Sequence, residues 1–180
     1  VTVEVGADKA TDDAGNGNTA SNTLSLTYDG TAPSVGITSS ETDPTNASPF
    51  AVTITFSEVV SDFALIDIDV SGGSASNLTA TTPNRIWTAD ITPGGDGGVT
   101  VSVDATVAQD AAGNPNTAAT PFQIDYDGTA PGVAITSTVG DPTDASPIPI
   151  TITFDEPVSG FVVGDLTVGN GTAGNLTETT

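Results

Sequence analysis

Apolar and polar residues alternate along several short stretches of this chain, with the period of two expected of β-strands buried on one face. In the stretch FAVTITF, the apolar residues on one face are Phe50, Val52, Ile54 and Phe56. The same alternation occurs over residues 35–37, 87–91, 99–103, 122–126 and 148–154. No window shows helical periodicity, and Thr, Val and Ile favour strands. The pattern therefore predicts an all-β protein.

Clusters of turn-forming residues separate these stretches. They are TDPTNASP, SGGSAS, TPNR, PGGDGG and DAAGNPN, all rich in Gly, Pro, Asn, Asp or Ser. About seven short strands in roughly 100 residues describe an immunoglobulin-like β-sandwich. The single tryptophan, Trp87, lies within an alternating stretch, so we expect it in the core. Tyr28 and Tyr126 also fall on positions that the pattern assigns to the core.

The chain repeats itself without a gap. YDGTAP occurs at residues 28–33 and again at 126–131, an offset of 98 positions. At the same offset, VTVEVGADKATDDAGNGNTA from Val1 returns as VTVSVDATVAQDAAGNPNTA from Val99. This is a tandem array of one domain type. Its phase predicts the C-terminal part of a repeat over residues 1–30, a complete repeat over 31–128, and the N-terminal part of the next over 129–180.

Several motifs of the repeat resemble a known family. They are TAP, then ITFSE with a following V-S-x-F, then D-x-x-V, then D-x-A-G-N, and a closing Y-D-G. The whole chain in this way resembles the bacterial Ig-like repeats of large secreted surface adhesins and biofilm-associated proteins. The resemblance implies a secreted or cell-surface location and a repetitive stalk that holds a terminal binding domain away from the cell. It also implies calcium at or near domain junctions.

Charge restricts the partners of the chain. The net charge is −21, with 23 acidic residues against Lys9 and Arg85 alone, so nucleic acid and anionic membranes are poor partners. No apolar run approaches the ~20 residues needed to span a bilayer, so we expect no membrane insertion of this segment. The expected partners are neighbouring Ig-like repeats of the same chain and other copies in a filament. Without cysteine, stability must come from packing, array length or bound ions.

The parity of the strands points independently to metal at the junctions. If seven strands alternate in direction, the N-terminal linker and every second loop meet at one end of the domain. The acidic and amide residues expected there in the complete repeat are Asp29, Glu58, Asp67, Asp110, Asn114 and Asn116. The next junction repeats the pattern with Asp127, Glu156 and Asp165. Their oxygen atoms suit calcium, which takes roughly six to eight oxygen ligands.

Turn chemistry is the alternative explanation of the same residues. Asp and Asn side chains accept hydrogen bonds from nearby backbone N–H groups, and Gly113 suits a positive φ, so DAAGNPN can be only a tight loop. Glu58 and Glu156 can be carboxylates that face water at the end of a strand. Asp43 and Asp141 each precede a proline, and we interpret them as turn formers rather than ligands.

Catalysis has little support, and we expect neither an enzyme nor catalytic residues. The chain has no His, no Cys and one Lys, so the usual pairs of nucleophile and base are unavailable. The favoured function is a structural extender of a cell-surface adhesin or extracellular filament, made rigid by calcium. The alternative is a carbohydrate-binding or surface-binding module, for which the outward threonines Thr53, Thr55, Thr151 and Thr153 are the candidates.

The partial repeats leave two possibilities open. The chain is either a window on a longer array or a subunit that its neighbours complete by strand exchange. Joined end to end, residues 1–30 and 129–180 would lack the region that matches Pro83 to Gly98, about 16 residues that include the Trp87 strand. This deficit favours the first possibility, that the chain is a window on a longer array.

Overall fold

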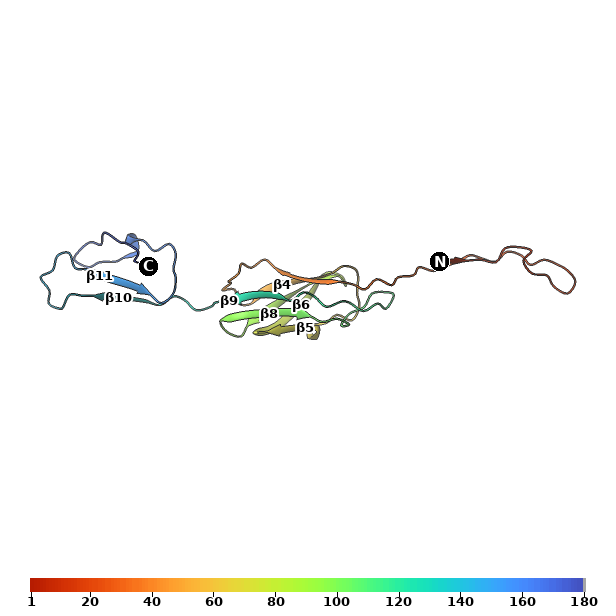
Figure 1. Cartoon of the computed structure of the whole chain (residues 1–180), viewed down its shortest axis with the longest axis horizontal. Coiled ribbons are helices and arrows are strands. Elements are labelled where there is room, and N and C mark those ends of the chain that lie inside the picture. The colour runs from red at the N-terminus through yellow and green to blue at the C-terminus, as the bar shows by residue number, and fades with distance from the viewer. Residues whose placement is uncertain (180) are drawn as a thin grey trace. The chain divides into compact units, whose positions relative to one another are not determined.

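The computed structural model describes residues 1–179, which form two compact units, residues 1–128 and residues 129–179 (Figure 1). The described residues contain no α-helix. Their regular structure consists of strands and two 3-10 turns, η1 (Leu65–Asp67) and η2 (Val163–Asp165). The prediction of an all-β protein is therefore confirmed.

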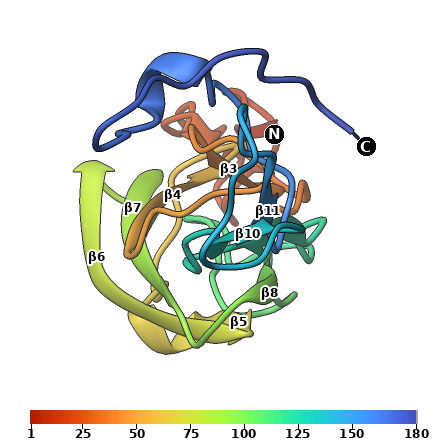
Figure 2. The ribbon, with the colours of Figure 1, turned by 90° about the vertical axis from the view of Figure 1, so that its left-hand side faces the viewer.

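The complete repeat is a sandwich of two antiparallel sheets. One sheet has the strand order β3-β4-β7-β6, with β3 at Val35–Ser39, β4 at Phe50–Phe56, β7 at Ile86–Pro93 and β6 at Gly73–Thr82. The other has the order β5-β8-β9, with β5 at Ile68–Ser71, β8 at Gly97–Val103 and β9 at Phe122–Tyr126. Figure 2 shows β6 beside β7 and β5 beside β8. These are the seven strands of the predicted Ig-like sandwich.

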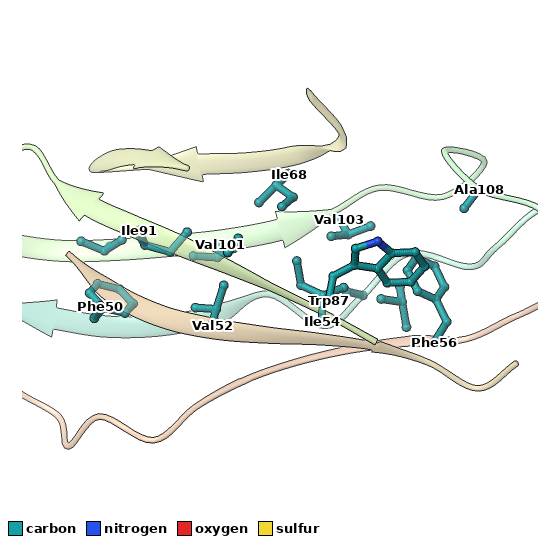
Figure 3. Close-up of a cluster of buried hydrophobic side chains, with 14 of the residues drawn as sticks. Phe50, Val52, Ile54, Phe56, Ile68, Trp87, Ile91, Val101, Val103 and Ala108 are labelled. Atoms are coloured by element: carbon teal, nitrogen blue, oxygen red, sulfur yellow. The ribbon is translucent and has the colours of Figure 1, made fainter. Parts of the chain in front are cut away.

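The core lies between the two sheets and consists of the inward-facing residues of their strands. Along β4 every second side chain is buried, and the intervening ones are exposed or half-buried. The facing sheet contributes Val99, Val101, Val103 and Ile124 to the same buried cluster. Figure 3 shows Val101 and Val103 among them. Because each sheet has one apolar face, the two faces can leave water only by packing on each other.

Trp87 lies in this core, as its place in an alternating stretch predicts. Its ring makes edge contacts with Phe56 and Phe63, with ring centroids 5.4 and 5.1 Å away. Phe56 and Phe63 are 5.1 Å apart in the same T-shaped arrangement. The three rings, with interplanar angles of 65–78°, fill this end of the core with the edge-to-face geometry that aromatic pairs prefer.

Residues 1–28 form a short hairpin within the first unit. Strands β1 (Thr2–Val3) and β2 (Leu24–Ser25) pair antiparallel. Tyr126 packs partly buried against the core, as expected, but Tyr28 is 84% exposed, so the core assignment of Tyr28 is wrong. The reason is that no second sheet covers this hairpin among the described residues, whereas β9 is covered.

The second unit repeats the first strands of the sandwich. Its hairpin consists of β10 (Val133–Ser137) and β11 (Ile150–Phe154), followed by η2. Phe154 and Phe161 meet edge to face at 5.3 Å, as their counterparts Phe56 and Phe63 do. Local pairing in this unit therefore forms without the rest of a sandwich.

Phe56→Ala should strongly destabilise the complete repeat, because it removes a fully buried ring in contact with two others. Truncation of a core Phe to Ala costs about 3–5 kcal/mol. Denaturant unfolding followed by the fluorescence of Trp87 measures this loss in the complete repeat alone, since the chain has one tryptophan. Thr55→Ala, at the exposed neighbouring position, is the control. Equal stability of the two variants would contradict the assigned core.

Candidate metal centre

Three carboxylates meet at one end of the complete repeat. Asp29, Glu58 and Asp110 each offer an oxygen atom, and these atoms lie within 4.8 Å of one another. Asp29 belongs to the linker before β3, Glu58 follows the end of β4, and Asp110 lies in the loop after β8. The pairing of Val35 with Phe56 places the start of β3 beside the end of β4, so the linker reaches the residues that follow β4. Antiparallel topology thus assembles the group from three distant segments.

The loop that carries Asp110 is shaped by hydrogen bonds to the Asp110 side chain. One carboxylate oxygen accepts bonds from the N–H groups of Ala112 and Asn114, both at 2.8 Å. The other accepts a 2.7 Å bond from Nδ2 of Asn114. Gly113 adopts a φ of +88°, which an L residue rarely takes. The predicted turn chemistry is therefore present, and it fixes the orientation of the carboxylate.

Asp110 is buried, with 6% of its surface exposed, yet it remains an acid of low pKa. The hydrogen bond from the Asn114 side chain lowers the pKa of Asp110 most. Burial raises it, and the backbone N–H groups of Asn114, Ala112 and Gly113 lower it further. The net shift is downward, so the group carries its charge at neutral pH.

Asn114 connects the loop to the linker. Its Nδ2 also donates to the backbone carbonyl of Asp29 at 3.2 Å. One Asp29 carboxylate oxygen accepts the N–H of Thr31 at 3.0 Å. Because the amide nitrogen of Asn114 points at the acidic group, this residue positions Asp110 and Asp29.

Asn116 has a different place from the one the sequence suggested. It is 2% exposed; its Oδ1 accepts bonds from Val107 N and Ala108 N, and its Nδ2 donates to the carbonyls of Asp104 and Thr117. All four bonds are 2.8–3.0 Å long. With its amide oxygen doubly occupied, Asn116 braces the loop base and does not join the carboxylate group.

Asp67 and Asp165 each accept a hydrogen bond from a residue three positions earlier in the chain. Asp67 accepts a 2.8 Å bond from the N–H of Ala64 and so holds the N-cap residue that precedes the η1 turn. Asp165 accepts the equivalent 2.9 Å bond from Val162 at η2. The structure does not bring Asp67 into the group of Asp29, Glu58 and Asp110. Its recurrence in both repeats follows from the 3-10 turn that each repeat contains.

The second junction remains a prediction. Asp127 lies next to the last residue of the first unit, where its N–H donates to the carbonyl of Thr45 at 2.9 Å, whereas Glu156 and Asp165 belong to the second unit.

The opposite end of the complete repeat holds its C-terminal linker by hydrogen bonds. Asp43 accepts a 2.9 Å bond from the N–H of Asp125, and Asp96 accepts a 2.7 Å bond from the N–H of Gly128. Thr45 accepts from Asp127 and donates to the carbonyl of Asp125. The interpretation of Asp43 as a turn former did not predict this hydrogen bond, which joins residues 82 positions apart. The recurrence of Asp43 as Asp141 in the next repeat is a sequence feature that could have indicated a structural role for this residue.

The carboxylate group suits a hard divalent cation. Three like charges so close repel one another unless a cation lies among them. Carboxylate oxygens with backbone carbonyls are the ligand set of calcium, whereas zinc sites are built mainly from His and Cys, which this chain lacks. The residues present therefore fit calcium, with Asp29, Glu58 and Asp110 as ligands and Asn114 as their support.

Asp110→Asn should reduce the stability of the complete repeat in a pH-dependent way. Because the folded pKa of Asp110 is lowered, its ionised form stabilises the fold above the unfolded pKa of about 3.9, and this contribution is lost as the pH falls through the folded pKa. The gap in unfolding free energy between the unaltered chain and the variant should shrink as the pH falls from about 6 through the unfolded pKa and into the acid range below it.

Urea unfolding with Trp87 fluorescence, in chelator, measures this gap. Asp12→Asn is the matched control, since Asp12 makes the same bonds to Ala14 and Asn16 in the hairpin of residues 1–28. A gap that does not change with pH would contradict the role assigned to Asp110.

Asn116→Ala should destabilise the complete repeat by roughly 2–4 kcal/mol with and without calcium, because it removes the hydrogen-bond partners of buried groups. The control is Asn18→Ala, since Asn18 makes the equivalent bonds at the base of the loop in the first hairpin. The control should leave unfolding monitored by Trp87 unchanged. A loss seen only in calcium would instead make Asn116 part of the metal site.

Comparison with known proteins now identifies the family. No helix among the described residues is both long and apolar enough to span a bilayer. No curated protein and no solved structure matches the chain. The profile of the family described as "Bacterial Ig-like domain" matches residues 29–126 and, immediately after them, residues 127–180. Together these matches cover more than four fifths of the sequence, so the chain belongs to the bacterial Ig-like domain family, as two adjacent segments in tandem.

Proposed function

We propose that this chain is a structural extender of a bacterial cell-surface adhesin or extracellular filament, in which calcium orders the linker before each domain. The family supports an Ig-like module of the surface or extracellular kind, typically structural and not enzymatic. The observation that carries the proposal is the meeting of Asp29 with Glu58 and Asp110.

Asp29 matters because it belongs to the linker, whereas the other two carboxylates belong to the domain. A cation bound by all three would fasten the linker to the end of the sandwich. In tandem arrays each repeat contacts its neighbours alone, so the linkers decide how far the array bends. A metal at this position would therefore stiffen the array without changing the core.

The other end of the domain restrains its own linker by direct hydrogen bonds. Residues 125–128 are held by Thr45, Asp43 and Asp96. One linker thus joins a group of carboxylates, and the other is held by hydrogen bonds from its backbone to the Thr45 backbone and to the Asp43 and Asp96 side chains. Restraint of the chain at both ends of a domain is what a load-bearing spacer requires.

The charge of the chain supports the same function. A net charge of −21 makes neighbouring domains repel one another and favours separation along the chain. Salt weakens this repulsion, since the Debye length is about 8 Å at physiological ionic strength. Calcium at the linkers would neutralise part of the charge at the points where domains follow one another.

The binding-module alternative has one observation in its favour. A row of threonines crosses the four-stranded sheet through the pairs Thr38–Thr53, Thr53–Thr88 and Thr88–Thr79. These side chains are exposed or half-buried. However, Trp87 and the Phe residues of β4 are buried, so no aromatic platform accompanies the hydroxyl row. Threonine on the outer face of a sheet follows from its strand propensity alone.

Calcium should raise the thermal stability of the complete repeat, because a ligand that binds only the folded state stabilises it. At a free concentration of about 100 times Kd the gain is about 2.7 kcal/mol. The measurement is thermal unfolding of the chain, followed by Trp87 fluorescence, in calcium, magnesium and chelator at fixed ionic strength.

Glu58→Gln and Asp29→Asn should each remove the calcium-specific rise. Asp69→Asn, an exposed carboxylate of β5 outside the group, is the control and should retain it. Equal melting temperatures in calcium and chelator would overturn the metal-ordered linker and leave Asp29 and Asp110 as turn-forming residues.

A further inference from the structure

The C-terminal linker of the complete repeat is fastened to the segment that follows β3. Thr45 forms a parallel bridge with Tyr126. The Thr45 N–H donates to the carbonyl of Asp125, and the Thr45 carbonyl accepts the N–H of Asp127, both at 2.9 Å. The Asp43 carboxylate accepts the N–H of Asp125, also at 2.9 Å. We name these three hydrogen bonds the latch.

The latch joins the first and the last strand of the sandwich. Thr45 follows β3, and residues 125–127 end β9 and begin the linker. β3 and β9 are edge strands of opposite sheets, so the sheet ladders do not pair them with each other. Thr45 is 6% exposed, which keeps water away from its backbone bonds and strengthens them.

The direction of the two segments decides how the latch responds to tension. Because the bridge is parallel, both segments run the same way. The N-terminal linker leaves the first segment backwards, and the C-terminal linker leaves the last segment forwards. Tension on the two linkers therefore slides one segment past the other. Bonds between strands run across the strand direction, so this sliding strains the latch bonds together instead of opening them one after another.

The N-terminal linker is also bonded to remote parts of the repeat. The carbonyl of Pro33, which is fully buried, accepts the N–H of Thr117 at 2.9 Å. The N–H of Ser34 donates to Oγ of Ser57 at 3.0 Å, and the N–H of Ser57 donates to the Ser34 carbonyl at 2.9 Å. Tension that enters at this linker is thus passed to the loop before β9 and to the end of β4.

Asp96 adds a further restraint at the C-terminal linker. It lies in the loop between β7 and β8, and its carboxylate accepts the N–H of Gly128 at 2.7 Å. Hydrogen bonds to an ionised carboxylate are stronger than those between neutral groups. Asp96 therefore shares with the latch the tension that arrives at the C-terminal linker.

We propose that the latch carries tension along the array and must break before the complete repeat unfolds under force applied to its two linkers. This function goes beyond a spacer that is only stiff. It rests on the proposed stalk for the source of the tension, but its bonds lie within the protein and need no calcium.

Force spectroscopy of the whole chain, in chelator, tests the proposal. The chain has no cysteine, so one cysteine added at each end attaches the handles at known positions. Unfolding of the complete repeat is recognised by an increase in length of roughly 300 Å, since about 100 residues become extended. The measured quantity is the rate of unfolding at constant force.

Asp43→Ala and Asp127→Pro each remove one bond of the latch. The first removes the acceptor of the Asp125 N–H, and the second removes the N–H that Thr45 accepts. Each should raise the unfolding rate by about fivefold or more, the effect of one hydrogen bond that is intact in the folded state and broken in the transition state. Asp127→Pro alters the linker and not the core, so it tests the latch even if Asp43→Ala does not fold.

Two controls separate the latch from charge and from general stability. Asp69→Ala removes an exposed carboxylate of β5 outside the latch and should leave the rate unchanged. Ile91→Val shortens a buried side chain of β7 and should lower the stability measured by urea unfolding about as much as one lost hydrogen bond. It should raise the rate under force by less than about twofold, because β7 stays paired with β4 and β6 until the latch has opened.

The comparison with Ile91→Val decides the outcome. If Asp43→Ala and Asp127→Pro raise the unfolding rate under force no more than Ile91→Val does, the latch carries no special share of the tension and the proposal is overturned. Because every rate is measured in chelator, that result would leave the calcium site of Asp29, Glu58 and Asp110 unaffected. Melting temperatures that do not respond to calcium would in turn leave the latch unaffected.

Discussion

The burial of two apolar sheet faces against each other is the constraint on which the rest of this structure depends. Each strand of the sandwich has one apolar face, and neither sheet can remove that face from water alone. The complete repeat satisfies the constraint with strands drawn from residues 35–126. Residues 1–28 and the second unit show the same strand pairing without a second sheet, and their apolar faces remain exposed. Strand pairing therefore forms within a single hairpin, whereas burial of the apolar faces requires both sheets of a complete repeat.

The same architecture accounts for the carboxylate group. Because the strands alternate in direction, the N-terminal linker and the segments after β4 and β8 arrive at one end of the sandwich. Asp29 and Asp110 are 81 positions apart in sequence but belong to one group of oxygen atoms. The packed core fixes the ends of the strands, and the segments that adjoin those ends bring the three carboxylates together. Such a division between scaffold and loops is common in functional sites of β-proteins.

Local hydrogen bonds complete the loops before any tertiary contact is needed. Asp12 and Asn16 adopt in the first hairpin the same bonding that Asp110 and Asn114 adopt in the sandwich. The pKa of Asp12 is lowered for the same first reason as that of Asp110, a hydrogen bond from the side chain of the Asn four residues later. Turn chemistry and metal ligation are thus compatible explanations of this motif, since the turn orients the carboxylate that a cation would use.

By itself the sequence determined the strands, their inward faces, the repeat of 98 positions and the family, because periodicity and turn residues are local signals. It also indicated the end of the domain at which Asp29, Glu58 and Asp110 meet, through the parity of strand directions. Tertiary structure alone decided which polar residues at that end share the group. Asn116 and Asp67 have the same side-chain chemistry as their neighbours, but a side-chain oxygen of each accepts a hydrogen bond from the N–H of a nearby residue, Ala108 and Ala64 respectively. Likewise Tyr28 and Tyr126 both begin the sequence YDGTAP, and only the presence of a covering sheet makes one of them part of a core. That covering sheet is supplied by residues far away in the chain, and the local sequence around each tyrosine carries no record of it.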